Sequence, residues 1–173
     1  MHLAVIDMQR VFADPTSPWA TPGFGAIVPA VAALAARFAP RVTFTRFVAP
    51  AEPTGAWREY YARWPFALRP PGARLWELAP PFAADDPLDA PTFSKWGTDL
   101  AARAGGGPLV VAGVSTDCCV LSTVVAAADA GMPVRVVADA CAGVDEQSHR
   151  AAVHVMSLYG PLVEVVDSSD LLP

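Results

Sequence analysis

Short runs of apolar residues alternate with longer alanine-rich or amphipathic stretches along this chain. The short runs predict strands at residues 3–6, 42–47, 109–112, 134–138 and 162–166. The stretches between them predict helices at residues 26–38, 117–130 and 145–159, where glycine and proline residues mark the ends of the last two. Strands that are apolar on both faces and alternate with helices predict an α/β fold, with a mostly parallel open sheet covered on both faces.

Residues 48–91 interrupt this alternation. The segment is rich in proline and predicts one short helix, at about residues 54–64. So long an irregular insertion in a compact domain is typically either functional or disordered. Its aromatic residues favour an ordered segment that forms a pocket wall or a subunit contact. We therefore expect one domain, residues 1–173, that contains this insertion.

Composition limits the partners. Hydrophobic residues make up 53% of the chain, which predicts a large core and enough remaining apolar surface for a homo-oligomer, a dimer or a tetramer. The net charge of −5 argues against nucleic acid or an anionic membrane as a partner, and no apolar run reaches the roughly 20 residues of a membrane span. The first predicted strand begins too early to leave room for a signal peptide, and three cysteines, two of them adjacent, make a poor disulfide framework. We expect a cytoplasmic protein.

The residues after the strand at 109–112 carry the candidate chemistry. A polar turn there opens a helix with two adjacent cysteines in its first turn. Unpaired backbone N–H groups and the positive end of the helix dipole favour the reactive thiolate, and the same N–H groups could hold a developing oxyanion. Asp7, Arg46, Cys119 and Asp139 all lie at or just after strand ends, so a parallel sheet would bring them to the edge where ligands bind.

Three motifs resemble those of the isochorismatase-like cysteine hydrolases. Residues 5–12 resemble the first-strand signature of that family, and residues 94–100 resemble its Ser-x-aromatic-x-Thr-x-Leu element. Residues 113–120 resemble its nucleophile turn, in which the cysteine directly precedes a valine. This last match assigns the nucleophile to Cys119 rather than Cys118.

The resemblance implies a three-layer α/β fold and a Cys-Asp-Lys triad that hydrolyses small amides or ureido compounds. We expect the reaction to pass through a thioester and to need no cofactor. Carried over to this chain, Asp7 takes the thiol proton and Cys119 attacks the carbonyl carbon. The backbone N–H groups of Ser115 and Cys119 hold the oxyanion, and the peptide bond between Val114 and Ser115 is cis.

The sequence departs from the family pattern in two places. The usual position of the triad lysine holds Ala90, whereas Lys95, the only lysine of the chain, lies five residues later in the same element. Either Lys95 reaches the site from a shifted backbone, which we favour, or the lysine role is lost or passes to an arginine. The nicotinamidase branch binds a metal through Asp and His after the second strand. Residues 45–50 contain neither, so we expect no metal and no nicotinamidase activity.

Gln9, Arg46, Trp57 and Trp96 are the candidate substrate-binding residues. Gln9 lines the pocket or serves hydrogen bonding in a turn. An arginine at a strand end could clamp a carboxylate, although a surface arginine is the simpler interpretation. These two tryptophans, together with Tyr60, Tyr61 and Trp64, could stack on a planar substrate, although packing in an interface explains them equally well. Asp117 is expected to be structural and to point away from the nucleophile, because its charge would oppose thiolate formation.

Other functions also fit the sequence. Vinyl-ether hydrolysis, as in the isochorismatases proper, needs no cysteine nucleophile, so Cys119 argues against it. A catalytically inactive binding or assembly protein of the same fold would explain Ala90 as the trace of a lost triad. A redox-sensing thiol protein would use Cys118 and Cys119 together.

Overall fold

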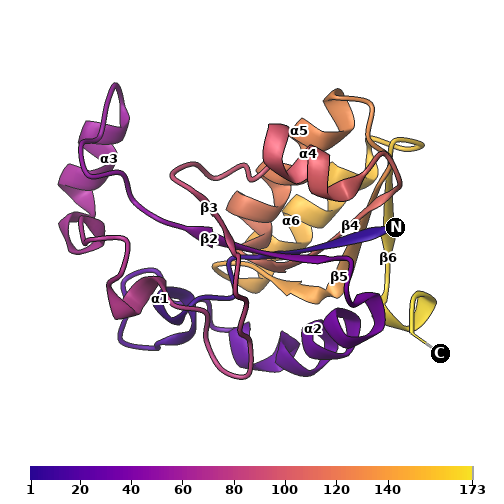
Figure 1. The fold of residues 1–173 in the computed structure, drawn as a ribbon, viewed down its shortest axis with the longest axis horizontal. Coiled ribbons are helices and arrows are strands. Elements are labelled where there is room, and N and C mark those ends of the chain that lie inside the picture. The colour runs from indigo at the N-terminus through magenta and orange to yellow at the C-terminus, as the bar shows by residue number, and fades with distance from the viewer. Residues whose placement is uncertain (173) are drawn as a thin grey trace.

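One six-stranded parallel sheet organises the protein, whose computed structural model describes residues 1–172 (Figure 1). The strands follow the spatial order β3-β2-β1-β4-β5-β6, and every neighbouring pair is parallel. Their bounds are β1 His2–Ile6, β2 Val42–Phe47, β3 Leu88–Ala90, β4 Leu109–Val114, β5 Val134–Ala142 and β6 Val163–Val166. The predicted parallel α/β architecture is confirmed.

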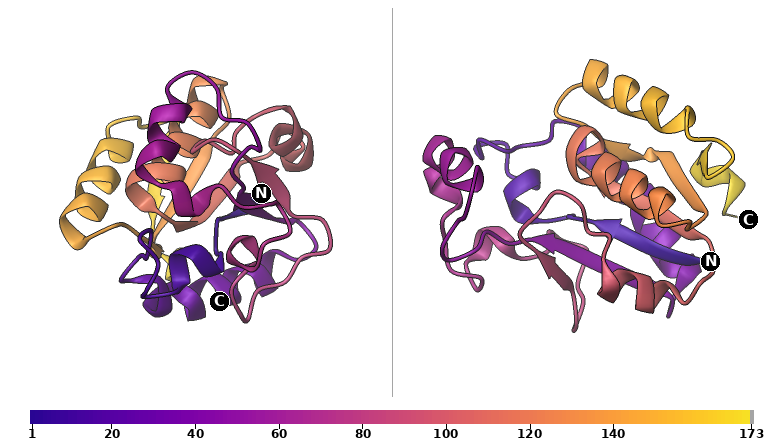
Figure 2. Two further views of the ribbon diagram at one scale, coloured as in Figure 1. Left: turned by 90° about the vertical axis from the view of Figure 1, so that its left-hand side faces the viewer. Right: turned by 90° about the horizontal axis from the view of Figure 1, so that it is seen from above.

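Helices cover both faces of the sheet. Helix α2 lies along one face, and α4, α5 and α6 lie along the other (Figures 1 and 2). The helices are α1 Arg10–Ala13, α2 Phe24–Phe38, α3 Trp57–Arg63, α4 Thr98–Ala104, α5 Leu121–Asp129 and α6 Glu146–Ser157. Shorter helical turns are η1 Pro65–Ala67, η2 Arg74–Trp76, η4 Ser168–Asp170 and a π-helical turn, η3 Thr116–Val120.

The centre of the sheet is apolar on both sides, as the sequence predicts. Every residue of β1 and β4 is buried, because helices pack on both faces of these two strands. Helix α2 contributes Phe24, Ile27, Val31, Leu34 and Phe38, which recur every three or four residues and so form one buried stripe. In the part of the chain that the structure describes, no helix is long and apolar enough to cross a membrane.

Several element boundaries differ from the prediction. Strand β3 and helix α4 were not predicted, because each is short and shows no clear periodicity. Strand β5 continues to Ala142, so Asp139 lies inside a strand instead of after its end. The pairing of β5 with β6 stops at Val137 and Val166, which leaves the Asp139 side chain exposed to solvent. There its carboxylate accepts hydrogen bonds from the backbone N–H and the hydroxyl of Ser168.

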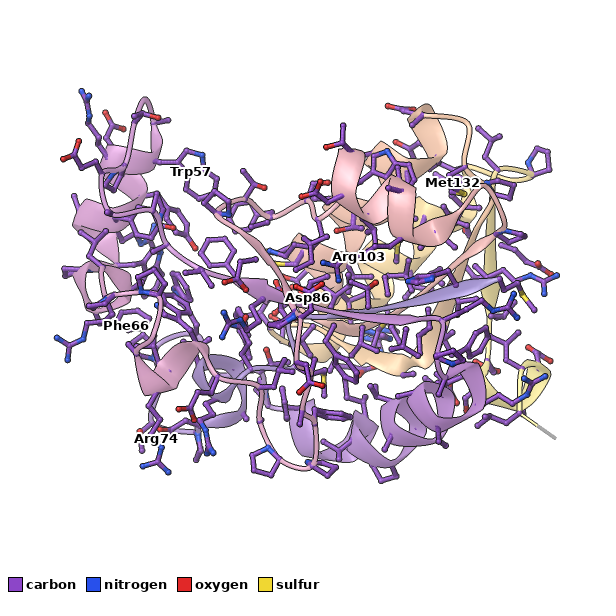
Figure 3. The ribbon with its side chains drawn as sticks, viewed as in Figure 1. Trp57, Phe66, Arg74, Asp86, Arg103 and Met132 are labelled. Carbon is purple, nitrogen blue, oxygen red and sulfur yellow. The ribbon has the colours of Figure 1, made fainter. Side chains whose placement is uncertain are left out.

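The insertion forms an ordered lobe beyond the carboxyl ends of the strands. It contains α3, η1 and η2 and stands to the left of the sheet in Figure 1, and its residues Trp57 and Phe66 are labelled in Figure 3. Tyr61 and Trp76 are 1% and 0% exposed and belong to the same hydrophobic core as the sheet, so the lobe is packed against the rest of the domain. Asp86 also pairs with Arg103 of α4 at 2.8 Å, which ties the end of the insertion to the sheet layer (Figure 3).

Candidate active site

The sheet order creates a junction between β1 and β4. From β1 the chain crosses to α2 on one face, and from β4 it crosses to α5 on the other, so the carboxyl ends of the two strands border an opening. Gly113 lies opposite Ile6 in this pair, with a φ of +121°. A Cβ at Gly113 would overlap the carbonyl oxygen of Ile6. Glycine is therefore required for the two strands to approach this closely at the junction.

Asp7 is the first residue after β1 and is completely buried. Its φ of +48° is uncommon for a residue with a side chain, although aspartate tolerates this region better than most. The Thr45 hydroxyl donates to Asp7 Oδ1 at 2.7 Å and accepts the Asp7 N–H at 3.2 Å. Backbone and carboxylate are thus both fixed by one residue of β2.

Lys95 reaches the same point from the loop between β3 and α4. Its side chain is 0% exposed, and Nζ lies 3.0 Å from Asp7 Oδ2. Nζ donates a hydrogen bond to the Thr92 carbonyl at 2.7 Å and lies 4.8 Å from the centre of the Phe47 ring. The ammonium contacts Oδ2 as an ion pair without hydrogen-bond alignment. Among the described residues Oδ2 therefore has no hydrogen-bond partner and keeps its capacity to accept a proton.

Cys119 lies on the π-helical turn η3, directly after β4. The Ser115 carbonyl accepts the N–H groups of Cys118 and Val120, both at 3.1 Å, on either side of Cys119. Thr123 links the turn to Lys95, since its hydroxyl donates to the Cys119 carbonyl at 2.6 Å and accepts the Lys95 N–H at 2.9 Å. One hydrogen-bonded chain therefore fixes both segments.

The thiol of Cys119 is neutral in the resting protein. Burial raises its pKa well above the usual range, the negative charge of Asp7 raises it further, and the positive charge of Lys95 lowers it. The expectation that the helix start favours the thiolate is therefore wrong for the resting site, because the side chain is only 3% exposed and desolvation dominates. Burial and the Asp117 carboxylate likewise raise the pKa of Cys118 to about 11.

Ser115 joins β4 to this turn. Its peptide bond with Val114, for which the resemblance implies the cis form, is cis. The Ser115 hydroxyl lies 3.2 Å from that of Thr21, and both residues line a cavity of about 270 Å³. Cys118 and Cys119 line the same cavity, so the thiol faces a space that can hold a small molecule.

A family model described as the isochorismatase domain matches residues 2–170. The chain belongs to the isochorismatase family. The resemblance seen in the three sequence motifs is thereby confirmed at the level of the family. Among curated protein sequences none matches this chain.

Solved structures of this family share the fold. A cysteine hydrolase from Pseudomonas syringae pv. phaseolicola superposes with a TM-score of 0.85 at 21% identity, over 98% of this chain and 89% of that one. An isochorismatase family protein from Desulfovibrio vulgaris gives 0.82 at 26% identity, over 98% of this chain and 95% of that one. A pyrazinamidase from Pyrococcus horikoshii, in complex with zinc, gives 0.76 at 26% identity, over 96% and 98%.

The residues of this chain do not fit the zinc site that the pyrazinamidase comparison suggests. Within residues 1–172 there is no group of three or more His, Cys, Asp or Glu side chains that could hold a metal ion. His2 pairs with the Thr43 hydroxyl at the opposite end of the sheet, and His149 pairs with the Thr116 hydroxyl.

Two candidate substrate-binding residues form hydrogen bonds outside the pocket. Gln9 is buried, and its amide donates to the carbonyls of Phe47 and Trp76 and accepts the N–H of Phe47, so it serves the backbone and does not line the pocket. Arg46 forms two hydrogen bonds of 2.6 Å with Asp89. The alternation of β2 turns Arg46 to the face opposite Thr45 and Phe47, so the predicted clamp is wrong.

The aromatic wall of the pocket also differs from the prediction. Trp57 packs against Phe47, Tyr61 and Phe93 without lining the cavity, and Trp96 does not line it either. The rings that do line it are Phe12, Trp19, Phe47, Tyr60, Trp64 and Phe93. Of these, Tyr60 and Trp64 were among the rings that the sequence suggested for stacking, and the rings that it missed include Trp19 and Phe93. Both lie close to recognised motifs, Trp19 after the first-strand signature and Phe93 just before Lys95, and this proximity was the available signal.

Asp117 lines the cavity as well. Its Oδ1 accepts the N–H of Val144 at 2.9 Å, and its Oδ2 lies 3.5 Å from the Cys118 sulfur. The carboxylate therefore helps to fix the start of η3, as expected of a structural acid. It also places a negative charge on the pocket wall, which was not expected.

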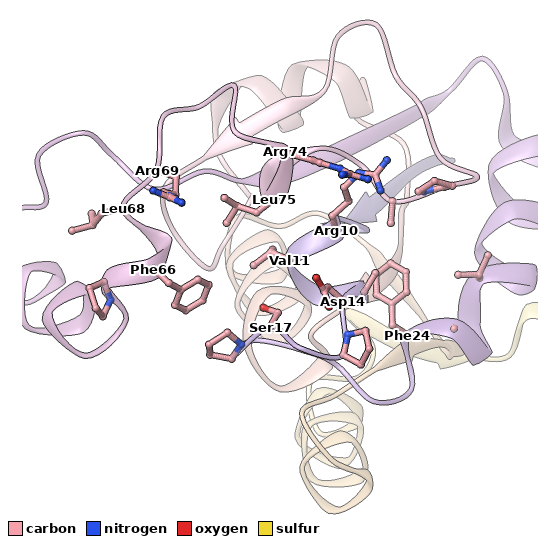
Figure 4. A pocket seen from close by; sticks show the side chains of 18 residues that line it. Arg10, Val11, Asp14, Ser17, Phe24, Phe66, Leu68, Arg69, Arg74 and Leu75 are labelled. Carbon is pink, nitrogen blue, oxygen red and sulfur yellow. The ribbon is translucent and has the colours of Figure 1, made fainter.

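A larger groove of about 890 Å³ lies beside the insertion lobe (Figure 4). It is lined by α1, the start of α2 and the segment from Pro65 to Pro80, with Arg10, Arg69 and Arg74 among its side chains. Cys119 is not among its lining residues, whereas it does line the smaller cavity. The smaller cavity in front of the cysteine is therefore the candidate active site.

Proposed function

We propose that this isochorismatase-family protein hydrolyses a C–N bond of a small amide or ureido compound through a thioester on Cys119. The observation that supports this most directly is the fully buried ion pair of Asp7 and Lys95 beside the Cys119 thiol. Burying two charges is costly and is commonly associated with a functional role. The similarity to a pyrazinamidase, a named amidase, also favours C–N hydrolysis.

The first half of the reaction acylates the enzyme. Asp7 Oδ2, which has capacity to accept, takes the proton from Cys119 Sγ as the sulfur attacks the carbonyl carbon. The new C–S bond forms as the carbonyl π electrons move to oxygen, and the N–H groups of Ser115 and Cys119 stabilise that oxyanion. The tetrahedral intermediate then collapses, the C–N bond breaks, and the departing nitrogen takes the proton from Asp7. Ammonia or an amine leaves.

The second half releases the acid. A water molecule gives a proton to Asp7 and attacks the thioester carbon, and a second oxyanion forms in the same position. When the C–S bond breaks, the sulfur recovers the proton from Asp7. The enzyme returns to its resting state, and the carboxylic or carbamic acid departs. Two moderate barriers thus replace one high barrier.

Lys95 takes the role that the family assigns to its triad lysine. The family position holds Ala90, which ends β3, and the chain then turns so that Lys95 Nζ lies 3.0 Å from Asp7 Oδ2. Its positive charge lowers the pKa of the Cys119 thiol and so favours the thiolate as that forms. The distance supports our interpretation of Lys95 over a lost lysine or a substituting arginine.

The test combines turnover with capture of the intermediate. Purified protein is incubated with small primary amides and N-carbamoyl compounds, ammonia release is measured, and hydroxylamine is added to convert a thioester to a hydroxamate. We expect turnover and capture with the wild type, and neither with Cys119→Ala. Cys141→Ala is the matched control, because this buried thiol does not line the cavity, and it should retain both signals. Ammonia release that persists in Cys119→Ala, or none with any compound, would refute the proposal.

A further inference from the structure

The cavity in front of Cys119 is enclosed by a connected cluster of aromatic rings. The Trp19 ring lies 5.6 Å from Phe47, 5.9 Å from Tyr60 and 6.3 Å from Trp64, centre to centre. Phe93 joins the cluster through Phe47 and Tyr60, at 6.1 and 5.7 Å. Ring faces carry a negative potential, and several rings around one space attract a cation that has lost its water.

The charge on the cavity wall is also negative, like the potential of the ring faces. Among the described residues that line the cavity, Asp117 is the only one with a full charge. Tyr60 remains a neutral phenol, because burial raises its pKa above the usual range. The Asp117 carboxylate is fixed by the N–H of Val144, so its charge stays on the wall of the cavity. An anionic ligand group would meet aromatic rings and a carboxylate, and the described lining residues supply no basic side chain to balance it.

Within residues 1–172, two basic side chains lie over rings of this cluster, and neither makes the cavity wall positive. Lys95 is paired with Asp7, and neither lines the cavity, so the pair adds no net charge to the wall. The Arg63 guanidinium lies 5.4 Å from the centre of the Trp64 ring, but Arg63 is exposed and solvent screens its charge. In both contacts a cationic side chain lies over an aromatic ring of this cluster.

We propose that the aromatic cavity holds a tertiary or quaternary alkylammonium group, so that the substrate is a small amide or ureido compound whose acyl portion is positively charged. The substrate part rests on the hydrolysis proposed above. The corrected position of Arg46 is consistent with it, because that arginine is paired with Asp89 and supplies no partner for a substrate carboxylate. The cation lies among the rings, near the Asp117 carboxylate, while the carbonyl carbon faces Cys119.

The first experiment tests binding without chemistry. Choline and 3,3-dimethylbutan-1-ol have the same shape and differ in the charge of the central atom, so calorimetry with both isolates the contribution of charge. We expect choline to bind at least about tenfold more tightly. Trp64→Leu should abolish most of this preference. Equal affinity of the two compounds, or tighter binding of the neutral alcohol, would overturn the proposal.

A charge-matched pair of variants tests the carboxylate. Asp117→Asn keeps an acceptor for the Val144 N–H and removes the charge, and it should reduce the preference for choline severalfold. Asp139→Asn removes the same charge from a carboxylate that also accepts a backbone N–H, outside the cavity, and should leave the preference unchanged. An equal effect of both variants would mean that overall charge, and not the cavity wall, determines the preference.

The second experiment tests the substrate class with isosteric amides. Trimethylammonioacetamide should be hydrolysed with a kcat/KM at least about tenfold above that of 3,3-dimethylbutanamide, and the anionic sulfoacetamide should be the poorest of the three. Faster hydrolysis of the neutral or the anionic amide would refute the substrate class. A preference for choline without hydrolysis of any amide would refute the proposed hydrolysis and leave the cation-binding cavity intact.

Discussion

The buried ion pair between Asp7 and Lys95 makes a quantitative prediction about stability. Both side chains are 0% exposed, and their charged atoms lie 3.0 Å apart. Lys95→Met keeps most of the apolar volume and leaves the Asp7 carboxylate without its counter-charge. Removing one partner of a buried pair costs about 3–5 kcal/mol of the free energy of unfolding. At about 2–4 °C per kcal/mol for a chain of this size, Tm should fall by about 6–20 °C.

The measurement is chemical denaturation followed by tryptophan fluorescence, with a surface control and a double variant. Arg150→Met removes a cation from the pair with Glu146, whose side chains are 69% and 73% exposed, and should cost at most about 0.5 kcal/mol. Asp7→Asn combined with Lys95→Met removes both charges and keeps an acceptor for the Thr45 hydroxyl. This double variant should be more stable than Lys95→Met alone, because no uncompensated charge remains.

Two results would refute this reasoning. If Lys95→Met were within about 1 kcal/mol of the wild type, as expected of an exposed pair, the lysine would not be buried against Asp7 in solution. If the double variant were less stable than both single variants, the pair would contribute net stability by itself, and the cost of the single change would not come from an unpaired charge.

Two further predictions follow from the site. Since the pKa of Cys119 is raised, its rate of alkylation by iodoacetamide should increase about tenfold per pH unit up to pH 9 without a plateau. Asp7→Asn removes a negative neighbour of the thiol and should make alkylation at a fixed pH faster. A plateau below about pH 8 in the wild type would contradict the raised pKa. Gly113→Ala should cost at least about 3 kcal/mol of unfolding free energy, because its Cβ would overlap the Ile6 carbonyl at a positive φ. The control Gly131→Ala, with a φ of +81° and nothing within 4 Å, should cost about 1 kcal/mol in the same denaturation measurement, and equal losses would show that φ alone matters.

The central part of the fold was predictable because its residues leave few alternatives. β1 and β4 are continuous apolar runs, and runs of this kind are stable only where helices cover both faces. Once the sheet is parallel, topology alone brings the carboxyl ends of its strands to one edge. Asp7 and Cys119, each close to the end of such a strand, therefore come together although 111 positions separate them in the sequence.

The side-chain directions were not predictable in the same way. Both faces of β2 mix apolar and polar residues, so its composition does not tell which face is turned to the site. That depends on the packing of Thr45 and Phe47, which leaves Arg46 on the opposite face. Gln9 satisfies three backbone groups from distant segments, which no local pattern shows. The position of Lys95 depends on the path of an irregular loop after β3. In such a loop the spacing in the sequence does not determine how far the side chain lies from Asp7.

The raised pKa of Cys119 changes what an unreactive thiol means in this protein. The resting site contains the Asp7 carboxylate, the Lys95 ammonium and a neutral thiol, so its net charge is zero. If the thiol lost its proton to solvent, the buried site would hold two anions and one cation, and burial opposes this state.

If the proton moves to Asp7, the thiolate faces Lys95 and the net charge is still zero. Burial therefore opposes ionisation of the free thiol but does not oppose this transfer. Slow alkylation of Cys119 at neutral pH is thus compatible with catalysis, and turnover at pH 7 is expected although the pKa of the free thiol is raised.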